Sequence, residues 1–170
     1  PLMSARYQSI EHASLPCLTA FDHEAERAWF VLADPAGISL SKVLGRHGTP
    51  RFTWSTSVML QIARGVALLH EKELLHLDIR PSSIQVNSVT GDPSLVSMGF
   101  FQPRGGLLRS VMKLGQIGAL EDASTMAPEL VDAELYEGPS QATDVYALGA
   151  TLYTLLSGTQ PFTGGTVATI

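Results

Sequence analysis

The chain has 170 residues, of which 45% are hydrophobic and only 16% are charged, and its formal net charge is −5 at pH 7. This composition excludes intrinsic disorder for the bulk of the chain, because disorder requires low hydrophobicity and high charge. The acidic balance, with no visible basic stripe, leads us to expect no nucleic-acid partner. The lone cysteine, Cys17, excludes an intrachain disulfide framework and a cysteine-based zinc site.

The most apolar stretch, Ala142–Gly158, is shorter than the about 20 residues that a membrane-spanning helix needs. We therefore expect no membrane span within this chain, and a reducing, cytoplasmic location is the default. The mean hydropathy of +0.15 is high for a free-standing soluble domain.

The first part of the chain alternates apolar runs with turn signals. After a short helix end within residues 1–10, the apolar runs Leu15–Phe21 and Ala28–Ala33 flank the charged segment Asp22–Arg27, and this pattern predicts a β-hairpin. Next comes Asp34–Gly37, which is rich in residues that break regular structure and predicts a hinge.

Two helices are predicted in the next part. One or two helical turns are expected over Ser39–Gly45, ending at the glycine. A longer helix is expected over Thr53–Glu71, with Thr53 as its N-cap. Its apolar side chains recur at helical spacing, which indicates one buried face: Trp54, Val58, Ile62, Val66 and Leu69.

A second hairpin follows this helix. The strands are expected over Ser83–Asn87 and Ser94–Gly99, joined by the turn sequence Thr90–Pro93. From Gly99 to about Thr125 no period is sustained, and such a stretch is usually functional or mobile.

The last predicted helix runs over Gln141–Ser157, is capped by Ser140 and ends at Gly158 and Pro161. It is apolar on nearly every face, which predicts burial on all sides. The order of strand pair, hinge, helix, hairpin, long loop and helix indicates an α+β chain.

Four short motifs occur in order within this layout. They are HLDIRPSSI from His76, SMG from Ser97, APE from Ala127 and DVYALG from Asp144. Together they resemble the eukaryotic-type serine/threonine protein kinase family, whose signatures include H-R-D-x-x-x-x-N, D-F-G and A-P-E. The resemblance covers essentially the whole chain.

The resemblance implies a protein kinase-like bilobal fold. Residues 1–33 would be the end of the N-lobe, a helix tail and two strands, and residues 34–170 the hinge and most of the C-lobe. The N-lobe would be incomplete, and the mainly helical C-lobe would lack its last helices. A Gly-rich phosphate loop does not precede the hinge, and the first lysine is Lys42.

The resemblance also assigns candidate site residues. Asp78 stands where the family's general base accepts the proton of the substrate hydroxyl, and Arg80 stands for the lysine beside the γ-phosphate. The hinge residues Leu32, Ala33 and Asp34 would line an adenine pocket, although plain connector residues explain them equally well. The adenine would rest on the position of Gln85, where a polar amide is a poor floor for an apolar base.

Both metal positions depart from the family pattern. Ser83 replaces the asparagine and Ser97 the aspartate that hold Mg²⁺, and a neutral hydroxyl is a poor exchange for a carboxylate. We therefore expect no metal site and no cofactor. The favoured hypothesis is a pseudokinase that regulates or scaffolds a protein partner, with Asp78 retained for its hydrogen bonds. The alternative is an active ATP- and Mg²⁺-dependent serine/threonine kinase with atypical metal binding and an upstream Gly-rich loop and lysine.

Other family positions carry structural roles. His76 would pack in an apolar column with Met98, Leu18 and Tyr7, and Asp144 would hold the backbone of its loop from below. The remaining two structural positions are Gly99, a flexible pivot, and Glu129, whose usual arginine partner near the C-terminus of the domain is missing from this chain.

Overall fold

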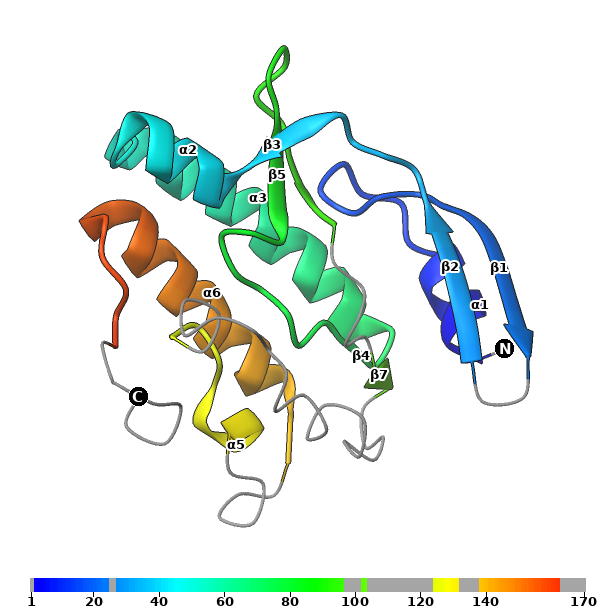
Figure 1. Ribbon diagram of the computed structural model, residues 1–170. Coiled ribbons are helices and arrows are strands. Elements are labelled where there is room, and N and C mark those ends of the chain that lie inside the picture. Colours follow the sequence, from blue (N-terminus) through cyan, green and yellow to red (C-terminus); the bar gives the residue numbers. More distant parts are fainter. Residues whose placement is uncertain (1, 25–26, 97–101, 104–123, 132–137, 163–170) are drawn as a thin grey trace.

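The computed structural model describes residues 2–24, 27–96, 102–103, 124–131 and 138–162 (Figure 1). The helices in this part of the chain are α1 (Leu2–Gln8), α2 (Leu40–His47), α3 (Phe52–Glu71), α5 (Pro128–Val131) and α6 (Gln141–Ser157). The strands are β1 (Leu18–Glu24), β2 (Arg27–Leu32), β3 (Gly37–Ser39), β4 (Leu74–Leu75), β5 (Ile84–Asn87), β6 (Pro93–Leu95) and β7 (Gln102–Pro103). The chain is a mixed α and β structure with small sheets, as expected.

The strands of the first hairpin have the predicted lengths but lie closer to the turn than the sequence indicates: the first is Leu18–Glu24 and not Leu15–Phe21, and the second is Arg27–Leu32 and not Ala28–Ala33. β1 and β2 are antiparallel, and the register pairs Asp22 with Trp29 and Glu24 with Arg27. Asp22, Glu24 and Arg27, which we expected in the turn, are therefore strand residues. A two-stranded ribbon has solvated faces, so charged side chains are tolerated along it, and charge alone does not mark its turn.

The predicted hinge leads directly into a strand. Gly37 begins β3, which pairs antiparallel with β5, and a Cβ atom on Gly37 would lie 2.6 Å from the carbonyl oxygen of Val86. Only glycine permits this approach of two backbones. In the three-stranded sheet β5 lies between β3 and β6.

The end predicted for α2 is wrong. The helix passes through Gly45 to His47, and Gly48 ends it with φ of 69° and an N–H that donates to the carbonyl of Leu44. A glycine inside a helix is destabilising but tolerated, whereas a left-handed residue stops the helix. Ser39 caps the N-terminus, since its side chain accepts from the N–H of Lys42.

The face predicted for α3 is correct and its cap is wrong. Val58, Ile62, Val66 and Leu69 are all buried. The N-cap is Arg51, which makes no side-chain capping hydrogen bond, and Thr53 lies inside the first turn. The threonine marked the approximate start because the following apolar period, rather than a cap, defines this helix.

The bounds predicted for α6 are correct. Ser140 and Thr143 form a capping box, and Gly158 ends the helix in the left-handed conformation with φ of 72°. The predicted burial on all sides is wrong, because Val145 is 60% exposed and Tyr153 is 50% exposed. One face of α6 packs on α3, and the opposite face carries these apolar side chains in solvent.

The second hairpin differs by one residue at the start of each strand, and its first strand ends at Asn87 as predicted. Ser83 precedes β5, and Pro93 belongs to β6 rather than to the turn, while Gly91 adopts φ of 79°. Strand β6 ends at Leu95. The motif at Ser97, Met98 and Gly99 lies outside the described residues, as does most of the stretch from Gly99 to Thr125.

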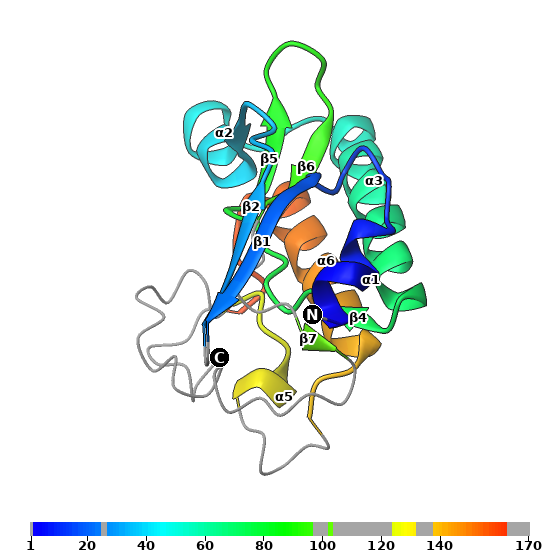
Figure 2. The same ribbon diagram turned by 90° about the vertical axis from the view of Figure 1, so that its right-hand side faces the viewer.

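The hydrophobic core links the helices to both hairpins. Figure 2 shows α3 and α6 side by side, with α1 and the β1–β2 ribbon along one side of them. The buried core residues are Tyr7, Leu15, Leu40, Val58, Met59, Ile62, Val66, Leu69, Leu74, Ile79, Ile84, Val86, Leu95, Ala147 and Leu155. In the described part of the chain, no helix has the length and hydropathy of a membrane span.

Candidate functional site

The loop from His76 to Ser83 connects β4 to β5 above the first turn of α6, and Asp144 holds it there. The Asp144 carboxylate is fully buried. Its Oδ2 accepts from the backbone N–H of His76 at 2.9 Å, and its Oδ1 accepts from that of Leu77 at 2.8 Å. Leu77 has φ of 64°, a left-handed conformation that costs a non-glycine residue about 1 kcal/mol or more. Two charge-assisted hydrogen bonds offset that cost and fix the loop.

A third group shares this carboxylate. The Nε2–H of His70, in the last turn of α3, donates to Asp144 Oδ2 at 2.8 Å, and the carbonyl of His70 accepts from Gln141 Nε2. Asp144 therefore joins α3, α6 and the loop. Sequence reasoning missed His70. The available signal was its position six residues before His76 at the end of a strongly periodic helix.

His76 shapes the loop from inside. Its side chain is fully buried, and its Nδ1 accepts from the backbone N–H of Asp78 at 3.3 Å. Two of its three expected apolar companions, Tyr7 and Leu18, belong to or pack against the core cluster. The third, Met98, lies outside the described residues.

Asp78 and Arg80, the candidate catalytic pair, contact each other. Arg80 Nε donates to Asp78 Oδ1 at 2.7 Å, and only 8% of the Asp78 side chain is exposed. Within the described part of the chain, Asp78 Oδ2 is buried and has no hydrogen-bond partner. Oδ1 of this carboxylate is thus paired with Arg80. Oδ2 retains its capacity to accept a proton or a hydrogen bond.

Ser83 closes the loop on itself. Its buried Oγ lies 2.6 Å from the carbonyl oxygen of Asp78 and 2.9 Å from that of Arg80, and it accepts from the backbone N–H of Arg80 at 3.0 Å. A hydroxyl has one proton and two lone pairs. One carbonyl takes the proton, and the N–H of Arg80 takes a lone pair. Ser83 therefore links the end of the loop to its middle by hydrogen bonds.

The described residues at this site do not fit a magnesium ion. Mg²⁺ requires near-octahedral oxygen ligands and is usually held through carboxylates and substrate phosphates. Ser83 supplies a neutral hydroxyl that is already engaged with the backbone. No group of three or more His, Cys, Asp or Glu side chains within the described ranges has the geometry to hold a metal ion. The other degenerate position, Ser97, lies outside those ranges.

The candidate nucleotide residues lie on the connection between the two hairpins and on β5. Leu32 ends β2 and packs against the core, and the N–H of Ala33 donates to the carbonyl of Cys17. The Asp34 carboxylate accepts from the N–H of Ala36 at 3.0 Å, which closes a local turn. Gln85 is half-buried on β5, opposite Ser39 and Ser94.

Glu129 is anchored to α6 next to Asp144. Its Oε1 accepts from the hydroxyl of Thr143 at 2.5 Å, and that hydroxyl accepts in turn from the backbone N–H of Ser140. The A-P-E motif, which begins α5, is thereby tied to the capping box of α6. Burial, and secondarily the charge of Glu129, raise the pKa of Tyr146 above its ordinary value.

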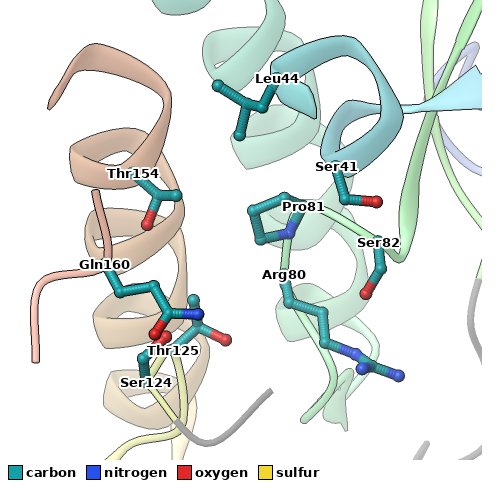
Figure 3. A pocket seen from close by; sticks show the side chains of 9 residues that line it. All are labelled: Ser41, Leu44, Arg80, Pro81, Ser82, Ser124, Thr125, Thr154 and Gln160. Atoms are coloured by element: carbon teal, nitrogen blue, oxygen red, sulfur yellow. The ribbon is translucent and has the colours of Figure 1, made fainter. Parts of the chain in front are cut away.

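A pocket of about 200 Å³ opens beside the loop (Figure 3). It lies between α2, the loop, the segment before α5 and the end of α6. Its lining residues are Ser41, Leu44, Arg80, Pro81, Ser82, Ser124, Thr125, Thr154 and Gln160. Five of the nine carry hydroxyl groups, one is a cation and none is an acid. The candidate nucleotide residues are not among them.

The fold and the loop define a class. A buried aspartate at the start of a central helix holds the backbone of an H-x-D loop, and an A-P-E segment is fastened beside it. Comparison with known families agrees, because the profile of the protein kinase domain matches residues 5–170. The chain belongs to the protein kinase family.

The curated relatives are serine/threonine kinases at low identity. The chain is 29% identical over 129 residues to the serine/threonine-protein kinase ATG1b of Arabidopsis thaliana, an alignment that covers 75% of the chain and 17% of the relative. It is 27% identical over 156 residues to ATG1c of the same plant, with 91% and 20% covered. It is 30% identical over 134 residues to the serine/threonine-protein kinase PknK of Mycobacterium bovis, with 78% and 11% covered. The chain thus spans a fifth or less of the length of these three relatives.

Proposed function

We propose that this chain is a pseudokinase-like domain that regulates or scaffolds a protein partner and does not transfer phosphate. The observation that carries the proposal is the engagement of Ser83. At the position where the family presents a metal-ligating asparagine, this chain places a neutral hydroxyl that is hydrogen-bonded to the backbone of its own loop. The loop geometry is therefore maintained by the protein alone and needs no metal ion.

The pairing of Arg80 with Asp78 supports the same proposal. In a working site both groups would face the reacting phosphate and hydroxyl, whereas here the guanidinium neutralises the carboxylate at 2.7 Å. The structural contacts of Asp144 and Glu129 are intact. A chain that maintains the scaffold of the loop without a fitting set of metal ligands suits a binding role better than a catalytic one.

The first test is nucleotide binding. We expect no thermal shift with ATP, with or without Mg²⁺ or Mn²⁺. A metal-dependent rise of several degrees would count against the proposal. The doubly restored variant Ser83→Asn with Ser97→Asp is the positive control, because it returns both family ligands, and a metal-dependent shift in that variant alone supports the proposal.

The second candidate function is an active serine/threonine kinase with atypical metal binding. It is favoured by the buried Asp78 Oδ2, which is without a partner among the described residues and is available to accept the proton of a substrate hydroxyl. Under this function ATP and Mg²⁺ are cofactors. The test is radiolabel transfer by the full-length protein that contains this domain, compared with its Asp78→Asn variant. Transfer that disappears in the variant establishes this second function in place of the first.

A further inference from the structure

The charges of this chain are segregated along the sequence. Residues 35–70 include Lys42, Arg46, Arg51 and Arg64 and not a single aspartate or glutamate. This segment carries +4, which leaves −9 for the remainder of a chain whose net charge is −5. A local positive surface on an acidic protein is a feature that selects partners by charge.

Three of these cations cluster around α2. Lys42 and Arg46 are four residues apart on α2 and therefore share one of its faces, and Arg51 directly precedes α3. All three are exposed, and within the described part of the chain none of them makes an ion pair. Arg46 also lies favourably in the last turn of its helix. Its charge remains directed to solvent.

The pocket described above lies on the other side of the same helix. Ser41 and Leu44 line it from α2, and Thr154 and Gln160 reach into it from the opposite wall toward Pro81 (Figure 3). Thr154 Oγ1 donates to the carbonyl of Ala150, so it offers only lone pairs to a ligand. The exposed hydroxyl of Ser82 supplies a donor, and the hydroxyl of Ser41 is hydrogen-bonded to that of Ser39 at 2.9 Å. With no acid among the described residues of the lining, a lysine or arginine side chain would find no counter-ion on them and would enter at a high desolvation cost.

From this arrangement we infer that the pocket and the cations of α2 form one docking site for an acidic protein segment. A carboxylate side chain of the partner enters the pocket, and further acids of the same segment cross α2 to reach Lys42 and Arg46. A helix is about 10 Å wide and an extended chain rises about 3.3 Å per residue. The flanking acids therefore lie about three or four residues from the residue in the pocket.

The inference rests on the proposed function only in that the partner is a protein. It does not depend on whether the loop transfers phosphate. Nucleotide thermal shifts on the same samples report on the proposed function, and peptide binding reports on the docking site, so the failure of one is distinguishable from the failure of the other.

The test is fluorescence anisotropy with two labelled ten-residue peptides on a Gly/Ser background. One has glutamates spaced by three and four residues, and the other has lysines at the same positions. We expect the glutamate peptide to bind with an affinity that falls as salt rises, and the lysine peptide not to bind. Lys42→Glu should weaken binding by roughly fivefold and Ser82→Asp by roughly tenfold or more, because each places a negative charge beside the bound acid.

Matched controls make the same substitutions elsewhere on the surface. Lys72→Glu reverses an exposed cation at the end of α3, and Ser88→Asp adds a carboxylate to the exposed β5–β6 hairpin. Neither should change the affinity by more than about twofold. Equal effects of test and control variants would overturn the inference, as would no binding of the glutamate peptide at millimolar concentration. Equally tight binding of single-stranded DNA would overturn the inference by showing that the site binds any polyanion. Self-association that Lys42→Glu abolishes would overturn it by showing that the site binds a second copy of the chain.

Discussion

The carboxylate of Asp144 carries a prediction that can be worked from the structure. Asp144→Asn keeps the shape of the side chain but replaces one acceptor oxygen with an NH₂ group. If the amide oxygen takes the place of Oδ2, it retains the bonds from His76 and His70. The NH₂ group then faces the N–H of Leu77, and a buried donor is left without an acceptor.

The magnitude follows from two losses. An unsatisfied buried N–H costs about 1–3 kcal/mol, and the loss of charge from the remaining two bonds costs about a further 1 kcal/mol. We expect Asp144→Asn to lower the free energy of unfolding by about 2–4 kcal/mol. For a chain of this length that corresponds to a fall in Tm of roughly 5–15 °C.

The assay is urea and thermal unfolding followed by circular dichroism, with Asp92→Asn as the control. Asp92 is exposed in the turn of the β5–β6 hairpin, so its substitution should change stability by less than about 0.5 kcal/mol. If both variants unfold at the same urea concentration, the Asp144 carboxylate does not hold the loop.

Three further outcomes are expected. Ser83→Ala leaves the N–H of Arg80 without its acceptor and should speed hydrogen exchange within the loop, and unchanged exchange would show that the hydroxyl does not close it. The exposed apolar face of α6 should bind the dye ANS, and Val145→Ser with Tyr153→Ser should reduce the fluorescence; a wild-type protein that is monodisperse and does not bind the dye would contradict this. Burial, and secondarily the charge of Cys17, raise the pKa of Tyr7 well above its ordinary value near 10, so the unfolded chain ionises first and stability should fall as pH rises beyond about 10. Tyr7→Phe should flatten that alkaline loss in urea titrations, and a wild-type slope in the variant would assign the loss to other groups.

The two long helices could be predicted from sequence because an apolar period marks α3 and caps mark both ends of α6. In α6 the capping box at Ser140 and the left-handed Gly158 mark both ends, and the bounds are correct. In α2 two glycines three residues apart compete as terminators, and sequence alone does not show that Gly48 rather than Gly45 takes the positive φ. The short strand β3 could not be predicted, since it depends on pairing with the distant β5.

The candidate site, like the fold, has features that could be predicted from sequence and features that could not. The motifs predicted that Asp144 would hold the backbone of the His76 loop, and its hydrogen bonds confirm this. The catalytic and metal roles that the motifs assign to Asp78 and Ser83 stay predictions. Sequence did not reveal that Ser83 links to its own loop or that His70 shares the Asp144 carboxylate. The first contact joins a side chain to the backbone and the second joins two side chains far apart in sequence. The loop also contains the left-handed turn at Leu77, which residue type does not predict.

The contacts of Asp144 also bear on the order of folding. Its bonds to His76, Leu77 and His70 span 68, 67 and 74 residues of chain. Contacts of such long sequence separation form slowly, since a long loop must close before they are made. α3 can assemble from local interactions as it leaves the ribosome. The left-handed turn at Leu77 must wait until α6 has been synthesised and docked, so the loop that Asp144 holds is among the last parts to become ordered.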